Sequence, residues 1–260
     1  MAQAITSDYL QDLYTFPFKD ERWKTKFAVG SVLALVLMPF VYLSYIFLYG
    51  YSYRIMRGII VEDRQPFMPE WDDWGQLIGD GLKMMIVVLL PMIPMFLISM
   101  SIFPMMFGAT LIPALLQTSG RGGGEIFLAL LPLSIFFFTG IGGVMTVLTY
   151  LLQFMLPAAM GHVVATGELG AMFRFREWWP IFRVNIFGFV MAFVLYLVVS
   201  LIITFVMYAL MFTIILCVLL PFFFGAYMFY LILIQSTLYA QAYREGVLKL
   251  EEAGLAGEGA

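Results

Sequence analysis

Four long stretches of this chain contain no Asp, Glu, Lys or Arg. They are Phe27–Tyr53, Met84–Gly120, Ile126–Gly167 and Val184–Tyr243. A helix that crosses the hydrocarbon core of a bilayer needs about 20 mostly apolar residues. Charged residues make up only 12% of the chain, whereas a soluble domain carries about 25%. The sequence therefore predicts an all-α, polytopic integral membrane protein.

The lengths of these four runs limit how often the chain can cross. The last run is long enough for two helices with a turn near Phe212–Ile215, and Gly140, Gly142 and Gly143 mark either a break or a close helix contact in the third. Glycines of this kind break membrane helices or let them approach closely. We expect about six membrane segments, arranged as three helical hairpins in a single membrane domain. The domain covers 1–260, the hairpins cover 16–58, 67–165 and 173–246, and a flexible tail covers 247–260.

Thirteen of the fourteen basic residues lie where they can share one side of the membrane. Basic residues concentrate in cytoplasmic loops, so we expect both termini in the cytoplasm and a plasma-membrane location. Arg121, between the second and third runs, is then the one basic residue outside. The thirteen are Lys19, Arg22, Lys24, Lys26, Arg54, Arg57, Arg64, Lys83, Arg174, Arg176, Arg183, Arg244 and Lys249.

The first run decides whether this topology holds. To enter and leave on the same side, residues 27–53 must form a short hairpin that turns near Pro39. The alternative is a single crossing with the N-terminus outside, which strands four basic residues on the wrong side. The distribution of basic residues favours the short hairpin.

Aromatic and basic residues recur at the boundaries of the runs. Phe16–Asp20 and Phe173–Glu177 share the pattern aromatic-x-aromatic-basic-acidic, and Phe67–Lys83 is a looser copy. The first and last runs also end alike, in Tyr-x-x-x-Tyr-Arg at Tyr49–Arg54 and Tyr239–Arg244. Each copy fits a short interfacial helix with Trp at headgroup depth, and together they predict an internal repeat. The alternative is that any multi-pass protein carries Trp and Arg at its interfaces. The predicted lipid- or interface-binding residues are Trp23, Lys24, Lys26, Trp71, Trp74, Arg174, Arg176, Trp178, Trp179 and Arg183.

Three segments carry motifs that resemble a known family. Tyr14–Trp23 contains Tyr-Thr-Phe-Pro-Phe-Lys-Asp and a Trp, Gly50–Arg57 contains Gly-Tyr and two arginines, and Pro69–Lys83 contains Pro-Glu-Trp-Asp-Asp-Trp and Gly-Asp-Gly-Leu-Lys. The chain resembles the uncharacterised bacterial and archaeal multi-pass membrane family catalogued as domain of unknown function four thousand and thirteen. The resemblance is strong over 14–90 and rests on hydropathy beyond that range. It implies a polytopic membrane protein, and it carries over no reaction and no catalytic residue.

The densest group of charges is an acidic patch between the first and second runs. Pro69, followed by Glu70, Asp72 and Asp73, suits the first turn of a helix, where the helix dipole favours negative charge. A capped interfacial helix is therefore expected here, with Asp80 paired to a lysine one turn on. The alternative is docking of a basic partner or of a loosely held Mg²⁺ or Ca²⁺ ion. The patch consists of Glu62, Asp63, Glu70, Asp72, Asp73 and Asp80.

Other chemically active residues are sparse. His162 is the only histidine, and the nearest carboxylate in the sequence is Glu168, so a helix-end histidine bonded to backbone is expected. The glycine-rich segment Ser119–Glu125 lacks the Lys-Ser/Thr of a P-loop. The single cysteine, Cys217, excludes an internal disulfide. The sequence therefore predicts no catalytic residue, no cofactor and no metal.

The apolar runs contain no ionisable residue at hydrophobic depth, which disfavours a charge-coupled transporter. Polar residues do occur there. Gln153, Asn185 and Gln235 can either form interhelical hydrogen bonds or line a polar cavity. The net charge of −3 argues against a nucleic-acid partner.

These features favour a non-enzymatic membrane scaffold or accessory subunit. It would bind membrane lipids, a membrane-protein partner or further copies of itself. The alternative is a transporter, channel or lipid-moving protein for a neutral or amphiphilic substrate. A membrane-embedded enzyme is disfavoured, because no nucleophile–base pair or metal cluster can be assembled from the sequence.

Overall fold

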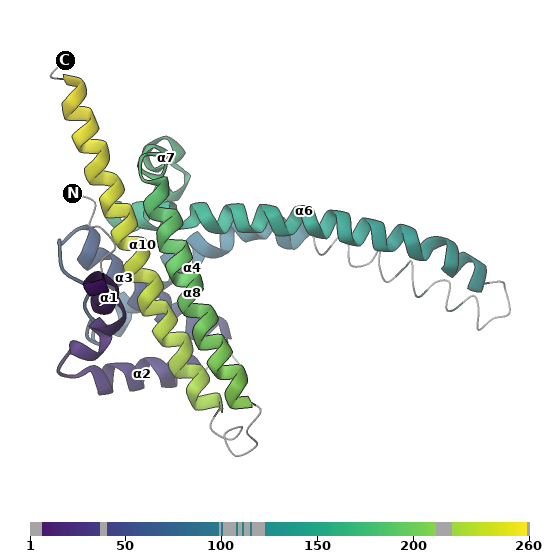
Figure 1. Ribbon diagram of the computed structural model, residues 1–260, viewed down its shortest axis with the longest axis horizontal. Helices are drawn as coiled ribbons and strands as arrows, with labels where there is room; N and C mark the ends of the chain where they lie inside the picture. Colours follow the sequence, from purple (N-terminus) through teal and green to yellow (C-terminus); the bar gives the residue numbers. More distant parts are fainter. Residues whose placement is uncertain are drawn as a thin grey trace. The chain divides into compact units, whose positions relative to one another are not determined.

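The computed structural model shows a helical protein (Figure 1). It describes residues 7–36, 41–98, 100, 108, 111, 115, 123–211 and 220–258. Within these residues it has eight α-helices, two short 3-10 helices and no strand, so the all-α prediction is confirmed for the described part of the chain. The elements are α1 (Ser7–Lys19), α2 (Trp23–Val36), α3 (Val41–Ile60), α4 (Trp74–Leu89), η2 (Leu90–Met92), α6 (Gly123–Thr166), η3 (Leu169–Phe173), α7 (Phe175–Val184), α8 (Ile186–Met211) and α10 (Leu220–Glu258).

Four helical stretches are long and apolar enough to cross a membrane. They are Trp74–Ile98, Thr139–Thr166, Ile186–Ala209 and Phe223–Gly254. Helices of this length and composition are what a multi-pass membrane protein requires. The first apolar run is divided between α2 and α3, and α2 has only 14 residues, fewer than the roughly 20 needed for a full crossing. The predicted turns at Pro39 and at 212–215, and the predicted outside residue Arg121, lie outside the described residues.

The chain divides into two compact units. The first contains Met1–Val87 together with Phe154–Ala260, and the second contains Val88–Gln153. The second unit thus holds the end of α4, η2 and much of α6, while the remaining helices belong to the first. The single membrane domain over 1–260, with its three hairpins, stays a prediction.

Helix α10 is the centre of the first unit. It packs against α1, α2, α3, α7 and α8, and its residues Phe229, Leu233 and Ile234 are fully buried. The helix extends to Glu258 (yellow in Figure 1), so residues 247–258, where the sequence suggested a flexible tail, are helical. A long helix with apolar side chains all round suits this place, because neighbours cover several of its faces.

Small residues bring pairs of helices into close contact. A Cβ atom at Gly50 of α3 would overlap the Leu77 carbonyl of α4, and a Cβ atom at Gly81 of α4 would overlap the Ile46 carbonyl of α3. The two glycines therefore allow the two backbones to touch. Membrane helices often associate in this way, because apolar contact alone gives no preference for protein over lipid.

Hydrogen bonds between helices complete the packing of the first unit. The buried hydroxyls of Ser52 in α3 and Ser236 in α10 lie 2.7 Å apart. Tyr9 of α1 donates to the Gln241 side chain at 2.6 Å, and Tyr230 of α10 donates to the Tyr14 carbonyl at 3.0 Å. Burial and the nearby Glu245 carboxylate raise the pKa of Tyr9 to about 12, so its hydroxyl keeps its proton throughout the physiological range.

The short helix α7 is strongly two-sided. Trp178, Ile181 and Phe182 are buried, whereas Arg176 and Arg183 are exposed. The indole of Trp178 donates to the Met172 carbonyl of η3 at 3.0 Å, which fixes the turn that leads into the helix. Residues 175–184 thus form a helix with one apolar and one basic face directly before α8.

Candidate functional site

A buried lysine organises the charged end of the first unit. Lys26 is 5% exposed, and its ammonium lies 2.7 Å from the Asp20 carboxylate, 2.8 Å from the Glu70 carboxylate and 2.8 Å from the Met68 carbonyl. Three acceptors match the three N–H donors of a lysine. A buried charge is costly unless it is paired in this way, so Lys26 ties the start of α2 to the segment that precedes α4.

The pKa values of this group follow from its partners. Burial alone would raise the pKa of Asp20, but hydrogen bonds from Lys26 and from the Arg22 amide, together with their positive charges, hold it below its ordinary value. Burial alone would lower the pKa of Lys26, but its bonds to Asp20 and Glu70 hold it above the ordinary value. Both groups therefore stay charged around neutral pH.

The segment before α4 is held by side chains from α2 and α3. Tyr51 donates to the Pro69 carbonyl at 2.7 Å, and its ring stacks on Trp71 at a centroid distance of 4.3 Å. The Trp71 indole donates to the Lys26 carbonyl at 2.9 Å. Arg54 donates to the carbonyls of Glu70 and Asp73. These bonds satisfy backbone groups that a helix would otherwise satisfy internally.

The prediction that Pro69 occupies the first helical position is wrong. Residues 69–73 are not helical, and α4 begins at Trp74. Asp73 caps the helix instead: its carboxylate accepts from the Gln76 amide at 3.2 Å and its carbonyl from the Leu77 amide at 3.0 Å. The helix starts later because Tyr51 and Arg54 bind the carbonyls of 69–73.

The carboxylates of the acidic patch are engaged in contacts within the protein. Five of its six members form salt bridges, and the sixth, Asp73, is the cap of α4. The predicted pairing of Asp80 with Lys83 is confirmed, at 3.4 Å. The pairs are Glu62 with Arg64, Asp63 with Arg244, Glu70 with Arg22 and Lys26, Asp72 with Arg54, and Asp80 with Lys83. Through Asp63, Glu70 and Asp72, the patch therefore joins separate segments of the first unit.

The only histidine lies in a second polar cluster, where α6, α7 and α10 meet. His162 is 7% exposed. Its Nδ1 lies 2.9 Å from the Tyr243 hydroxyl and its Nε2 lies 2.9 Å from the Glu177 carboxylate. A neutral imidazole with its proton on Nε2 satisfies both contacts, because it donates to the carboxylate and accepts from the hydroxyl.

This arrangement differs from the backbone bonding expected for His162. The partners come from side chains 15 and 81 residues further along the chain. Gly161 allows the contact, because any Cβ atom there would overlap the ring of Tyr243. Tyr243 belongs to the repeated Tyr-x-x-x-Tyr-Arg motif, so the sequence already marked it as a residue of interest. No sequence motif near His162 or Glu177 indicates that these two side chains meet.

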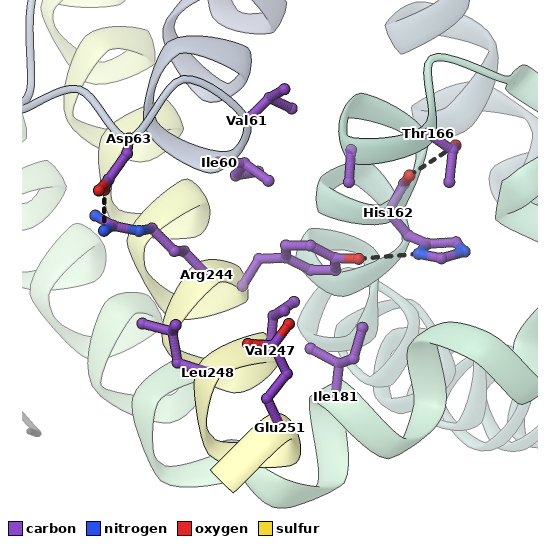
Figure 2. A pocket seen from close by; sticks show the side chains of 12 residues that line it. Ile60, Val61, Asp63, His162, Thr166, Ile181, Arg244, Val247, Leu248 and Glu251 are labelled. Carbon is purple, nitrogen blue, oxygen red and sulfur yellow. Dashed lines mark hydrogen bonds and ion pairs between the residues drawn. The ribbon is translucent and has the colours of Figure 1, made fainter. Parts of the chain in front are cut away.

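A cavity of about 590 Å³ opens beside this cluster. Figure 2 shows the ion pair of Asp63 with Arg244 on one side and His162, which contacts the Tyr243 hydroxyl, on the other. Asp63 adopts a left-handed backbone conformation with φ of 56°, which short polar side chains tolerate best among non-glycine residues. The lining residues are Ile60, Val61, Asp63, His162, Ala165, Thr166, Ile181, Tyr243, Arg244, Val247, Leu248 and Glu251.

The three predicted polar-cavity residues lie in different surroundings. Asn185 is 1% exposed; its amide donates to the Ala242 carbonyl at 2.8 Å and its carbonyl accepts from Lys249 at 2.7 Å. Gln235 donates to the Tyr239 hydroxyl at 3.2 Å, and Gln153 is exposed. None of the three lines the cavity beside His162. A polar cavity built from them stays a prediction.

The ten predicted lipid-binding residues divide by exposure. Lys26 and Trp178 are buried and serve internal contacts. Trp23, Trp71 and Trp179 are partly buried. The other five are exposed, although Arg174 is also paired with Glu168 and Glu177: Lys24, Trp74, Arg174, Arg176 and Arg183. Their lipid-binding role stays a prediction.

In the described part of the chain, no group of three or more His, Cys, Asp or Glu side chains lies in a position to hold a metal ion. Within the described ranges, the one carboxylate found against His162 is that of Glu177. Cys217 lies outside the described residues.

Comparison with known proteins identifies the family. No curated protein and no solved structure shows a significant match to this chain. The sequence model of the family described as "Protein of unknown function (DUF4013)" matches residues 32–212. The match thus includes α3, α4 and α7, but not the motif at Tyr14–Trp23 or any part of α10. Since it covers more than half of the sequence, the chain belongs to the DUF4013 family.

Proposed function

We propose that this protein is a non-enzymatic integral membrane scaffold or accessory subunit of the plasma membrane. It holds membrane lipids and a protein partner, or a second copy of itself, against its outer helix faces. Its about six membrane segments form three hairpins, with both termini in the cytoplasm. The distribution of thirteen basic residues to one side supports this orientation.

The outward face of α8 carries the proposal. Phe187 and Phe205 are 75% and 76% exposed, and further apolar side chains between them lie on the same side of the helix. Burying one such side chain is worth about 1.5–3 kcal/mol, so this face needs a cover of lipid tails or protein. The exposed residues of this face include Phe187, Val190, Val194, Leu197, Leu201 and Phe205.

The polar clusters support a structural role over catalysis. Lys26 has three acceptors within the unit, and both nitrogens of His162 have partners. Their bonds fix how the helices meet, which is the task of a scaffold.

Extraction in mild detergent, followed by native mass spectrometry, tests this proposal. We expect the full chain to be recovered with itself or with a specific membrane partner. The variant V194W places a bulky side chain on the α8 face and should lower this recovery, whereas V147W, at an exposed position of α6, should not. Recovery of the wild-type protein as a lone monomer in every mild detergent would contradict the proposal.

The cavity beside His162 favours a second candidate, a protein that moves an amphiphilic molecule. It combines apolar and charged side chains in one space of about 590 Å³. This candidate predicts faster transbilayer movement of a fluorescent phospholipid in vesicles that contain the protein. A rate equal to that of protein-free vesicles would eliminate phospholipid movement.

A further inference from the structure

The cavity beside His162 lies where helices leave the apolar layer. Helix α3 ends at Ile60 and α6 ends at Thr166, and both residues line the cavity. The last uncharged run ends at Tyr243, and Arg244 is the first charged residue after it. In a membrane protein this is the depth of the lipid headgroups, where long basic side chains reach phosphates.

The cavity lining contains two carboxylates and one guanidinium. The carboxylates belong to Asp63 and Glu251 and the guanidinium to Arg244, while both imidazole nitrogens of His162 already have partners. Arg244 is paired with Asp63. Among the described residues no hydrogen bond or ion pair is found for Glu251. In Figure 2 its side chain turns from α10 toward the other lining residues.

These charges suit a zwitterion that carries a primary ammonium group. The ammonium would neutralise Glu251 and donate hydrogen bonds to it, and the phosphate would share Arg244 with Asp63. A purely anionic headgroup would face two carboxylates. A choline headgroup has the right charge but no N–H to donate. The apolar wall formed by Ile60, Val61 and Leu248 suits the first part of an acyl chain.

We propose that this cavity binds the headgroup of a phosphatidylethanolamine molecule, with Glu251 receiving the ammonium and Arg244 the phosphate. This assignment rests on the proposed function, because it requires the protein to hold membrane lipid. It adds a specific lipid class and a specific place to that function.

The test uses the full chain in nanodiscs made from equal parts of phosphatidylethanolamine, phosphatidylcholine and phosphatidylglycerol. After mild extraction, mass spectrometry measures which lipids stay bound. We expect phosphatidylethanolamine to be enriched over the other two lipids. The substitution E251Q should lower this enrichment by up to roughly fivefold, as expected when an exposed charge contact is lost. R244Q should lower it to a similar extent.

Two exposed residues of the same types provide matched controls. Glu252 and Arg57 are exposed and do not line the cavity, so E252Q and R57Q should leave the enrichment unchanged. Thermal melting of each variant checks that it is folded. Should R244Q unfold because it loses the bond to Asp63, E251Q alone decides the question.

Each contrary result has a defined meaning. Enrichment of phosphatidylglycerol, or a loss with R244Q but not with E251Q, would overturn the zwitterion assignment. Displacement of the lipid by soluble phosphoethanolamine would assign the cavity to a soluble molecule and overturn the lipid assignment. Bound lipid without headgroup preference would refute the phosphatidylethanolamine site but not the proposed scaffold function. Recovery of a lipid-free monomer would refute both the site and the scaffold function.

Discussion

The ammonium of Lys26 shows how a single side chain can hold several segments. It sits at the start of α2 and bonds to a residue before that helix and to two residues before α4. Because the group is almost completely buried, removing one of its partners leaves a charge with less compensation. Asp20 is the partner whose role can be tested most cleanly, since it lies outside the apolar runs.

We expect D20N to lower the free energy of unfolding by about 1 kcal/mol at neutral pH, as for loss of a charge-assisted hydrogen bond. The folded state holds the pKa of Asp20 below its ordinary value. Its contribution is therefore complete above the unfolded-state pKa, about 3.9, and is lost as the pH falls through the lower folded-state pKa. Detergent-solubilised wild type and D20N should thus converge in stability only below about pH 4.

The exposed pair of Asp12 with Lys19 provides the control for this substitution. D12N should change stability by a few tenths of a kcal/mol at most, because solvent screens an exposed pair. An equal loss in D12N and D20N at neutral pH would show that burial of Lys26 does not strengthen its ion pairs.

At the scale of the elements, the crossing of α3 and α4 depends on two glycines. Gly50 and Gly81 each lie against a carbonyl of the other helix, so a side chain at either position must push the backbones apart. The same helix α4 contains Gly79, where a Cβ atom would meet nothing within 4 Å. Substitutions at Gly81 and Gly79 can therefore distinguish the effect of helix packing on stability from the effect of helix propensity.

We expect G81L to destabilise the protein by about 1–3 kcal/mol, as for other overpacked contacts. G79L should leave stability unchanged or raise it, because leucine favours a helix over glycine by roughly 0.8 kcal/mol. Thermal melting in detergent, followed by tryptophan fluorescence, measures both variants. A similar effect of the two substitutions would mean that α3 and α4 do not touch at Gly81.

For the whole molecule, the fold class can be predicted from the long uncharged runs of the sequence. The polar clusters cannot, because they depend on contacts between distant residues. Uncharged runs predicted helices and apolar spans, and a helical spacing of three residues predicted the pair of Asp80 with Lys83. The contact of His162 with Glu177 depends on how the chain turns between α6 and α7, for which the sequence has no local signal. The late start of α4 depends on Tyr51 and Arg54, which bind the preceding carbonyls from another helix.

The proposed topology can be tested by cysteine labelling in intact cells. With Cys217 replaced by serine, we expect R121C to react with a membrane-impermeant maleimide and R64C to react only after the membrane is opened. A third variant, Q3C, tests the first hairpin and should also be protected. External labelling of Q3C would instead establish a single crossing by the first apolar run.

The position of α10 also affects how the protein is made. This helix follows in the sequence every helix that it contacts, and α2 and α3 rely on it for much of their packing. Until α10 has been synthesised, the Ser52 hydroxyl lacks the Ser236 hydroxyl, and Gly30 lacks the Phe229 ring that lies against it in the finished unit. A chain truncated before residue 220 leaves these surfaces uncovered, and incompletely folded species of this kind are prone to aggregate.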